Sequence, residues 1–347
     1  MIFMKSVYSN KKSKIFIGDE FELDLDNIFN RGKFKNKTVI LITGVRSFIE
    51  SGYYKQLKNV FKRHKIVIVK HIKTKSNPDE LHIIHTLSTP EHKFDFIFAV
   101  GGGSAIDTGK LIKHHFNNSA KLIAVYTLPG SATIVTPFAI FDNSEFKVGM
   151  VADNFIPDYS YINTKIISSL NPERKSIAIA DIFSHAVESL YSRASNSASR
   201  TKAKNSLKIL VAHKVESLPT QELVMADIYA GLSERVGLVL FPHAAGHYLT
   251  YKFHIPHSIA TMYFLTQYLI FLSSKGISID LRYIKYAEYL ESLFKKKGLI
   301  QKIRLSKKQI FELFNLTHKY MNFAYENAPV RVEQNGYEII LKNYVKK

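Results

Sequence analysis

The pattern of apolar and polar residues differs between the two halves of this chain. In the first half, short apolar runs alternate with longer stretches in which apolar residues recur at helical spacing. The runs predict strands over 38–44, 65–72, 96–100 and 121–130, and the stretches predict helices over 53–64, over 78–89 and from residue 106 onward. Strands and helices in alternation predict a parallel sheet with helices on both faces.

The second half has helical spacing with few strand signals. Long helical patterns cover 173–195, 199–217, 220–240 and 307–326, and the change in character falls near residue 165. We therefore predict two domains: an α/β dinucleotide-binding domain over 1–165 and an all-helical metal-binding domain over 166–347.

A glycine-rich turn follows the strand predicted over 96–100. Gly101, Gly102, Gly103 and Ser104 come directly before the helical stretch that contains Asp107. The free N–H groups at a helix N-terminus favour anions, and glycines let a phosphate approach the backbone. The segment lacks the G-x-G-x-x-G fingerprint, so a tight turn without a ligand is the alternative.

Composition limits the remaining possibilities. The 347 residues are enough for two domains, and 46% hydrophobic with 22% charged residues is typical of a globular protein. Without cysteine, disulfides and thiolate ligands are excluded. We recognise neither a signal peptide nor an apolar run of about 18 residues, and we expect a cytoplasmic protein that does not enter the membrane.

The charge is strongly positive, with 48 Lys and Arg against 29 Asp and Glu, a net +19. A nucleic-acid-binding protein is one interpretation, but such proteins usually gather Arg and Lys on one element. Here the lysines are spread along the chain. We therefore expect no specific nucleic-acid partner; a positive field that attracts an anionic small molecule fits the same charge.

Histidines at helical spacing mark a candidate metal site. Asp181 and His185 lie four residues apart, as do His243 and His247, and His257 follows after a loop. Oxygen and nitrogen donors without sulfur suit Fe(II) or Zn(II). The chain has 14 histidines, so ordinary core or surface histidines are the alternative. Spacing alone leaves open which of residues 243, 247, 254 and 257 would bind.

Three collinear segments resemble the iron-containing alcohol dehydrogenase family, which is related in fold to dehydroquinate synthase and glycerol dehydrogenase. GGGSAIDTGK resembles the family's GGGSxxDxxK, DIFSHAVES its D-x3-H-x2-E, and HAAGHYLTYKFHIPH its H-x3-H-x9-H. The resemblance covers nearly the whole chain. It implies a Rossmann-like N-terminal domain and a helical metal-binding C-terminal domain.

The resemblance also implies roles for individual residues. The metal ligands would be Asp181, His185, His243 and His257, and His247 would be a non-ligand histidine near the nicotinamide, a candidate for proton relay. The pyrophosphate would lie at Gly101–Ser104 and Asp107. YTLPGSATIVT is similar to the family's PTTAGTGSEVT, and FKVGM contains its ribose-contacting lysine. Further cofactor contacts would therefore be Thr127, Leu128, Ser131 and Lys147.

Two positions depart from the family pattern. Ile134 stands where Glu is usual, and Ser258 stands where Gly is usual beside a predicted metal ligand. All four ligand positions remain, so we expect an active enzyme with an altered pocket. The alternative is a metal-free homologue that only binds.

Cofactor choice is predicted from the end of the strand over 38–44. NAD-specific members carry Asp at the position of Gly44, where a carboxylate would bond the ribose 2′-hydroxyl. With Gly44 and Arg46 there, a 2′-phosphate meets no negative charge and can meet a guanidinium. We predict NADPH as the preferred cofactor, with NADH tolerated; a simple turn with a solvated Arg46 is the alternative.

These observations predict an NAD(P)H-linked, metal-dependent aldehyde reductase or alcohol dehydrogenase with Fe(II), or else Zn(II), and a homodimeric assembly. The segments ITGVRSFIESG and HYLTYKFHIPHSIA look most like the family branch that reduces phosphonoacetaldehyde to 2-hydroxyethylphosphonate. A reductase of small uncharged aldehydes is the alternative.

Overall fold

The computed structural model describes residues 4–9, 13–75, 78–87, 93–117, 119–143, 145–301, 303–332 and 340–341. The chain forms two compact units. The first consists of Met1–Pro129, Thr133–Ser144 and Gly149–Leu170, and the second of Gly130–Ala132, Glu145–Val148 and Asn171–Lys347. The predicted boundary after residue 165 falls inside α6 (Thr164–Ser168), shortly before the first unit ends.

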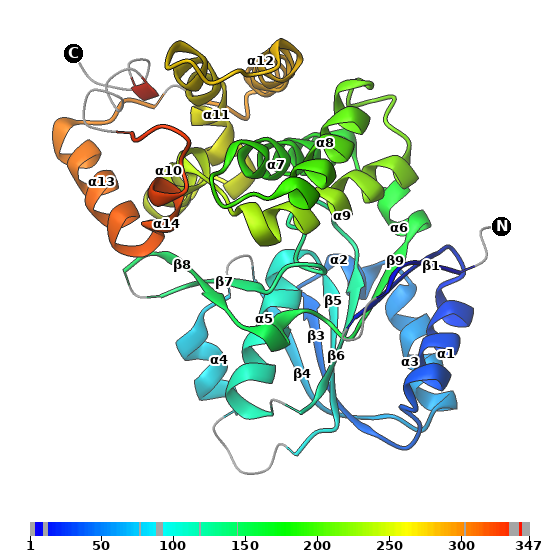
Figure 1. The fold of residues 1–347 in the computed structure, drawn as a ribbon. Helices are drawn as coiled ribbons and strands as arrows, with labels where there is room; N and C mark the ends of the chain where they lie inside the picture. Colours follow the sequence, from blue (N-terminus) through cyan, green and yellow to red (C-terminus); the bar gives the residue numbers. More distant parts are fainter. Residues whose placement is uncertain are drawn as a thin grey trace. The chain divides into compact units, whose positions relative to one another are not determined.

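A seven-stranded sheet forms the centre of the first unit (Figure 1). Its order is β1-β2-β9-β6-β5-β3-β4, and every neighbouring pair is parallel except β1 and β2. The strands are β1 (Lys5–Ser9), β2 (Lys14–Gly18), β3 (Thr38–Gly44), β4 (Val67–Thr74), β5 (Phe96–Gly101), β6 (Lys121–Tyr126) and β9 (Tyr159–Asn163). The four strands predicted from the sequence are β3 to β6, and the structure adds β1, β2 and β9.

The remaining elements of the first unit flank this sheet. A separate two-stranded sheet pairs β7 (Phe138–Asp142) with β8 (Lys147–Val151), whose first two residues belong to the second unit. The helices are α1 (Phe21–Gly32), α2 (Ser47–Glu50), α3 (Tyr53–Arg63), α4 (Glu80–Leu87), α5 (Gly103–Phe116), the short 3₁₀ helix η1 (Asp153–Phe155) and α6.

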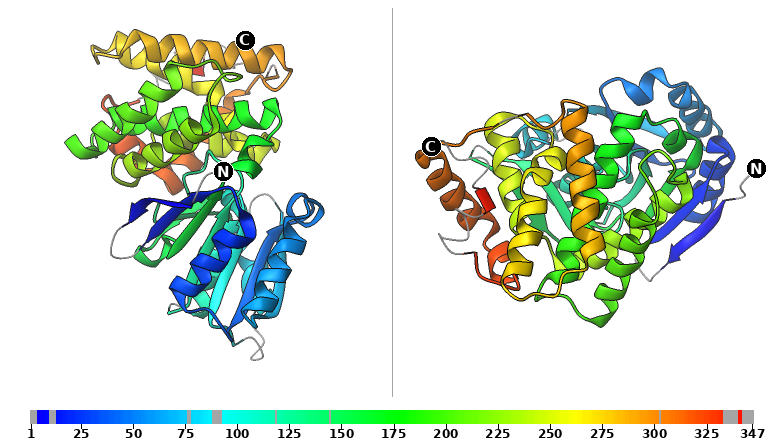
Figure 2. Two further views of the ribbon diagram at one scale, coloured as in Figure 1. Left: turned by 90° about the vertical axis from the view of Figure 1, so that its right-hand side faces the viewer. Right: turned by 90° about the horizontal axis from the view of Figure 1, so that it is seen from above.

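Strand β5 explains why helices cover both faces. Its residues are buried and point alternately to opposite sides. Phe96 and Phe98 join a core with apolar residues of α1 and α3. Ile97 points the other way, toward Gly109 of α5, where an added Cβ would lie 2.9 Å from the Leu122 side chain. The missing side chain at Gly109 therefore lets α5 pack closely on the sheet, on the face opposite α1 and α3 (Figures 1 and 2).

The described residues of the second unit are almost entirely helical, so the predicted fold class is confirmed. Helix starts follow ordinary capping rules: the Asn171 side chain accepts a hydrogen bond from Arg174 N at 2.8 Å, with Pro172 next to it. The helices are α7 (Pro172–Tyr191), α8 (Ser197–Val211), α9 (Thr220–Gly237), α10 (Phe241–Phe253), α11 (His257–Ser274), α12 (Leu281–Lys296), α13 (Lys307–Met321) and α14 (Phe323–Glu326).

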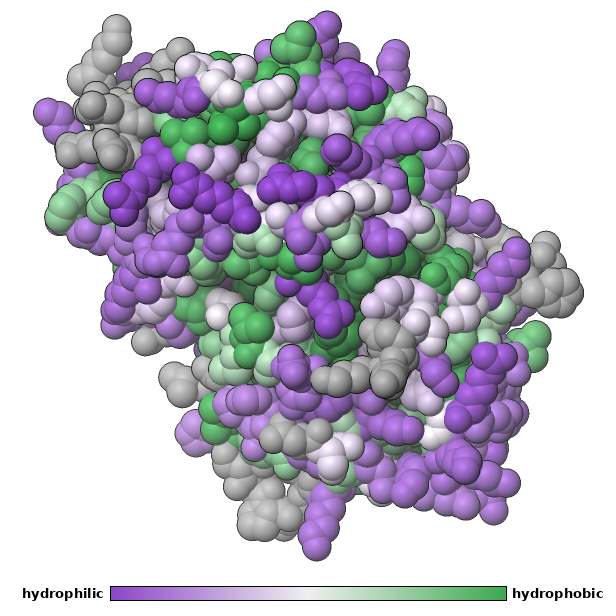
Figure 3. Space-filling model, viewed as in Figure 1, coloured by the Kyte–Doolittle hydropathy of each residue, from purple (hydrophilic) through white to green (hydrophobic). Residues whose placement is uncertain are grey.

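The surface carries its charges on both units. Lys37 pairs with Asp95 at 3.0 Å in the first, and Lys319 pairs with Glu145 at 2.6 Å in the second. Figure 3 shows hydrophilic side chains spread over the visible face. Among the described residues, no helix combines the length and the apolar character that crossing a bilayer requires.

Candidate functional site

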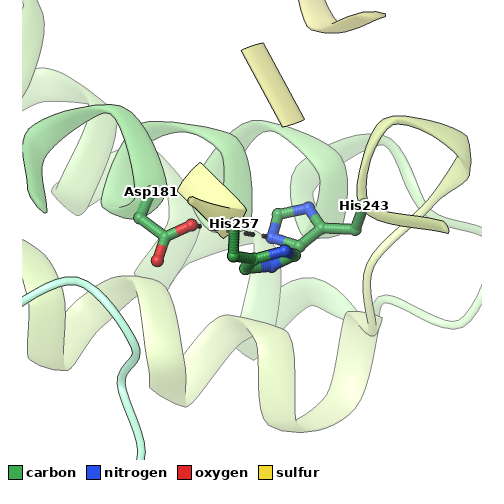
Figure 4. Close-up of side chains that lie close together, drawn as sticks. All are labelled: Asp181, His243 and His257. Atoms are coloured by element: carbon green, nitrogen blue, oxygen red, sulfur yellow. Dashed lines mark ion pairs between the residues drawn. The ribbon is translucent and has the colours of Figure 1, made fainter. Parts of the chain in front are cut away.

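Three helices of the second unit bring a carboxylate and two imidazoles together (Figure 4). Asp181 comes from α7, His243 from the first turn of α10, and His257 from the first residue of α11. One ligand atom of each lies within 4.8 Å of the others, in the part of the chain that the structure describes. Asp181 and His243 are 62 positions apart in the sequence, and His243 and His257 are 14 apart. The packing of α7, α10 and α11 thus brings distant residues into one group of donors.

These donors fit a divalent cation. Asp181 Oδ1, His243 Nε2 and His257 Nδ1 are buried atoms that have no hydrogen-bond partner among the described residues. The first two lie 4.0 Å apart, too far for a hydrogen bond. Burying an unpaired polar atom costs free energy, and a cation held between these three side chains would be a partner for all of them. Imidazole and carboxylate are ligands of Fe(II) and Zn(II).

Glu188 fixes the tautomer of His243. His243 Nδ1 lies 2.6 Å from Glu188 Oε1, and Leu240 N donates to Glu188 Oε2 at 2.7 Å. With its proton on Nδ1, His243 presents the lone pair of Nε2 to the donor group. Burial raises the pKa of Glu188, and the Leu240 N–H opposes that effect. Glu188 was not predicted as a site residue, although it stands three residues after His185 in the segment that resembles the family motif.

His185 lies beside the three-residue group without being part of it. Its ring stacks on that of His243 with centroids 4.6 Å apart. Its Nδ1 lies 3.1 Å from the carbonyl oxygen of Gly130, and its Nε2 lies 4.0 Å from Glu234 Oε1. Gly130 has φ +128°, a conformation that favours glycine, and it packs against α7. The segment Gly130–Ala132 of the second unit therefore shapes this side of the site. Nothing in the sequence pattern had singled out Glu234.

His247 is next to the donor group but faces a different partner. Its Nδ1 donates to the carbonyl oxygen of Lys147 at 3.0 Å, and its ring meets that of His257 edge-on with centroids 4.6 Å apart. Lys147 itself is buried. His254, which spacing could not separate from the other histidines, is exposed and ends α10 in a left-handed conformation with φ 55°.

Three buried histidines of the site, His243, His247 and His257, have pKa values below the ordinary value. Burial lowers the pKa of His243 to about 4 and, together with the Lys147 cation, that of His247 to about 3. Burial and Lys147 also lower the pKa of His257 far below its usual range. A neutral imidazole keeps a lone pair at neutral pH, which is the form that binds a metal ion.

The glycine turn of the first unit, which follows β5, lies close to the loop that follows β6. Thr127 N donates to the carbonyl oxygen of Gly101 at 3.0 Å. A Cβ on Gly102 would lie 3.2 Å from the Leu128 Cβ. The turn leads into α5, which begins at Gly103 and has Ser104 in its first turn. The structure thus brings Gly101 and Gly102 together with Thr127 and Leu128, and the contact of these residues with a cofactor stays a prediction.

Asp107 is occupied by protein groups. Its carboxylate accepts hydrogen bonds from Thr133 Oγ1 at 2.5 Å and from Ile140 N at 3.1 Å, and it pairs with the buried Lys110 at 3.3 Å. These contacts tie α5 to the segment that contains Ile134, which is fully buried. Asp107 therefore shapes the turn from inside the first unit.

The remaining cofactor positions divide between the units. Gly44 ends β3, Arg46 is exposed directly after it, and a Cβ on Gly44 would have only Ser47 Oγ within 4 Å, at 4.0 Å. Ser131 and Lys147 belong to the two short segments of the second unit. Ser258 lies in the first turn of α11 with ordinary backbone geometry, so glycine is not required there.

Comparison with known sequences identifies relatives of this chain. The sequence profile of iron-containing alcohol dehydrogenases matches residues 13–164, which are less than half of the chain and lie mostly in the first unit. Over these residues the chain carries an iron-containing alcohol dehydrogenase domain. The NADPH-dependent butanol dehydrogenase of Clostridium saccharobutylicum is 25% identical over an alignment of 222 positions that covers 56% of this chain and 56% of that protein. The bifunctional aldehyde-alcohol dehydrogenase AdhE of Escherichia coli K12 is 24% identical over 72% of this chain and 32% of its own length.

Solved structures of iron-containing alcohol dehydrogenases and related reductases share the fold over nearly the whole chain. An archaeal alcohol dehydrogenase from a Red Sea brine pool superposes with a TM-score of 0.82 at 19% identity, covering 99% of this chain and 100% of that one. A sulfoacetaldehyde reductase from Bifidobacterium kashiwanohense, solved with NAD⁺, gives 0.77 at 18% identity over 99% and 100%. At these identities the structures establish the fold.

Proposed function

We propose that this iron-containing alcohol dehydrogenase homologue interconverts an aldehyde and its alcohol with NAD(P)H and a divalent cation. The observation that carries the proposal is the convergence of three buried donor atoms without hydrogen-bond partners, those of Asp181, His243 and His257. Relatives named as alcohol and butanol dehydrogenases support the reaction class.

Four side chains of the second unit are proposed as the metal ligands: Asp181, His185, His243 and His257. Glu188 orients His243, and the Gly130 carbonyl orients His185 so that each Nε2 is free of a proton. When bound, Fe(II) or Zn(II) polarises a carbonyl oxygen as a Lewis acid, and the reduced nicotinamide supplies the hydride.

His247 is proposed to manage the proton. Because its Nδ1–H is directed at Lys147 O, its Nε2 is the nitrogen that can hold a hydrogen bond to a substrate hydroxyl or a ribose hydroxyl. In the reduction the carbonyl carbon gains the hydride and its oxygen gains one proton from solvent, which His247 can relay. The resemblance gives Lys147 a ribose contact, and the bond between Lys147 and His247 would then connect cofactor and relay within one unit.

The glycine turn is proposed to hold the cofactor pyrophosphate. The N–H groups at the start of α5 attract anions, and Gly102 leaves room that a side chain would fill. At the end of β3, Gly44 offers no carboxylate to repel a 2′-phosphate and the exposed Arg46 follows it. We therefore propose a preference for NADPH.

For the substrate we propose an anionic aldehyde, with phosphonoacetaldehyde as the first compound to test. The net charge of +19 favours an anion, and one structural neighbour is named a sulfoacetaldehyde reductase. Small uncharged aldehydes are the second candidate, because the relative from Clostridium saccharobutylicum is named a butanol dehydrogenase.

The deciding experiment is a reductase assay on metal-depleted protein reloaded anaerobically with Fe(II) or with Zn(II). Phosphonoacetaldehyde, sulfoacetaldehyde, propanal and butanal are each offered with NADPH and with NADH. We expect metal-dependent oxidation of NADPH with at least one aldehyde and the highest kcat/KM for an anionic one. Protein that binds metal and cofactor yet reduces none of the four, and oxidises none of the corresponding alcohols, would contradict the proposal and favour a homologue that only binds.

A further inference from the structure

A second carboxylate reaches the metal site from α9. Glu234 Oε1 lies 4.0 Å from His185 Nε2, and both side chains are largely buried, with 10% and 7% exposure. The neighbouring residue on α9, Ser233, is hydrogen-bonded to Ser189 of α7 at 2.8 Å, which fixes this face of α9 against α7. Glu234 therefore places a largely buried carboxylate beside a histidine of the site.

Glu234 stands on the ligand side of its histidine. The other ring nitrogen of His185, Nδ1, is directed at the Gly130 carbonyl at 3.1 Å, so Nε2 carries the lone pair. Glu188 differs, because it contacts Nδ1 of His243 at 2.6 Å, the nitrogen turned away from the other donors. Glu188 can therefore only orient a ligand, whereas Glu234 faces the nitrogen that would bind.

The spacing also suits two donors of one cation. Donors bound at about 2.0–2.2 Å to the same ion lie roughly 3 to 4 Å apart. His185 Nε2 and Glu234 Oε1 are separated by 4.0 Å, the same distance that separates His243 Nε2 from Asp181 Oδ1. The stacked rings of His185 and His243 place the two pairs next to each other.

We propose that Glu234 is a further donor of the metal centre. The donor set then has two carboxylates, those of Asp181 and Glu234, and three imidazoles. The inference rests on the proposed metal-dependent function. More donors and more oxygen favour Fe(II) or Mn(II), which accept five or six ligands, over four-coordinate Zn(II). Glu234 of α9 would then contribute to the preference of this chain for one metal ion over another.

The test measures metal binding without turnover. Wild type, Glu234→Gln, Glu234→Ala and the control Glu222→Gln are depleted of metal and titrated anaerobically with Fe(II), Co(II) and Zn(II). Glu222 lies on the same helix, but its side chain is 46% exposed and contacts His213 at 3.0 Å. We expect both Glu234 variants to bind Fe(II) and Co(II) about 10–100-fold more weakly, with a smaller loss for Zn(II). The visible bands of bound Co(II) should intensify in both, because they strengthen as the coordination number falls.

The Glu234→Gln variant distinguishes a metal-binding role of Glu234 from a role in packing, because glutamine has nearly the same shape but no charge. Wild-type Fe(II) affinity and an unchanged Co(II) spectrum in Glu234→Gln would overturn the inference, whatever Glu234→Ala does. A wild-type protein that binds no metal would instead overturn the proposed function. A change in Glu222→Gln as large as that in Glu234→Gln would also overturn the inference, because the effect would then belong to the helix.

Discussion

The glycine turn of the first unit and the histidine group of the second unit are each proposed to hold a charged partner, and they would do so with different parts of the chain. The turn uses backbone N–H groups and the absence of side chains at Gly101 to Gly103. The histidine group uses side-chain atoms from three helices. A backbone site is local in sequence, whereas a side-chain site exists only once distant helices have packed. The two should therefore fail separately when they are mutated.

The largest effect should come from removing a ligand. His257→Ala should abolish metal-dependent turnover, a loss of about 10³-fold or more, because Lewis-acid stabilisation is worth several kcal/mol. NADPH binding, measured by fluorescence, should be unchanged. His254→Asn is the control, since residue 254 is exposed and Asn tolerates its left-handed backbone. Full activity in metal-free His257→Ala would end the metal proposal.

Glu188→Gln should weaken metal binding by about 10–100-fold, the usual cost of losing a partner that orients a ligand. The amide NH₂ would face the Leu240 N–H, which now donates to a carboxylate oxygen at 2.7 Å. Isothermal titration with Zn(II) measures the loss. Unaltered affinity would show that Glu188 supports the fold and leaves the ligand geometry unaffected.

Gly102→Val should act on the cofactor alone. Its side chain would press on Leu128, since even a Cβ lies 3.2 Å from the Leu128 Cβ. Overpacking of this kind costs about 1–3 kcal/mol, so KM for NADPH should rise roughly 5- to 100-fold. Metal content, measured by elemental analysis, should equal that of wild type. Loss of metal in this variant would contradict the independence of the two sites.

Gly44→Asp should shift cofactor preference toward NADH by about tenfold. The new carboxylate would repel the 2′-phosphate of NADPH and could accept a hydrogen bond from the ribose 2′-hydroxyl of NADH. A hydrogen bond to a charged group is worth about 1.5–3 kcal/mol. The variant protein should fold normally, because only Ser47 Oγ lies near a Cβ added at Gly44, at 4.0 Å. The measurement is kcat/KM for both cofactors. A wild type that already favours NADH tenfold would refute the assignment.

The smallest effect concerns pH and the metal-free protein. In the folded protein, burial lowers the pKa of His243 to about 4 and that of His247 to about 3, below the ordinary histidine value of 6.5. The unfolded chain therefore takes up protons first as the pH falls, and stability should be lost progressively below about pH 6.5. Melting temperatures from pH 7.5 to 4 test this. His247→Asn keeps a donor for Lys147 O but cannot titrate, so its loss should be shallower; an equal slope would contradict the account.

Much of the fold could be predicted from the sequence because its signals are local. The apolar runs of β3 to β6 and the helical spacing from residue 172 onward each predict one element. Strands β1, β2 and β9 escaped prediction. They are five residues each, and β9 becomes a central strand only through pairing with β2 and β6. The homodimer and the cytoplasmic location stay predictions.

For the site, the sequence by itself determined which donors exist: Asp181 and the histidines that follow it at helical spacing, and a glycine turn after a buried strand. Only the tertiary structure decided their arrangement. It leaves His254 at an exposed helix end, sets Glu188 behind His243, and turns His185 toward Gly130 and Glu234. The physical reason is that helical spacing fixes the direction of a side chain within one helix, whereas a metal site depends on distances between helices. Those distances follow from the packing of α7, α9, α10 and α11, which no short motif records.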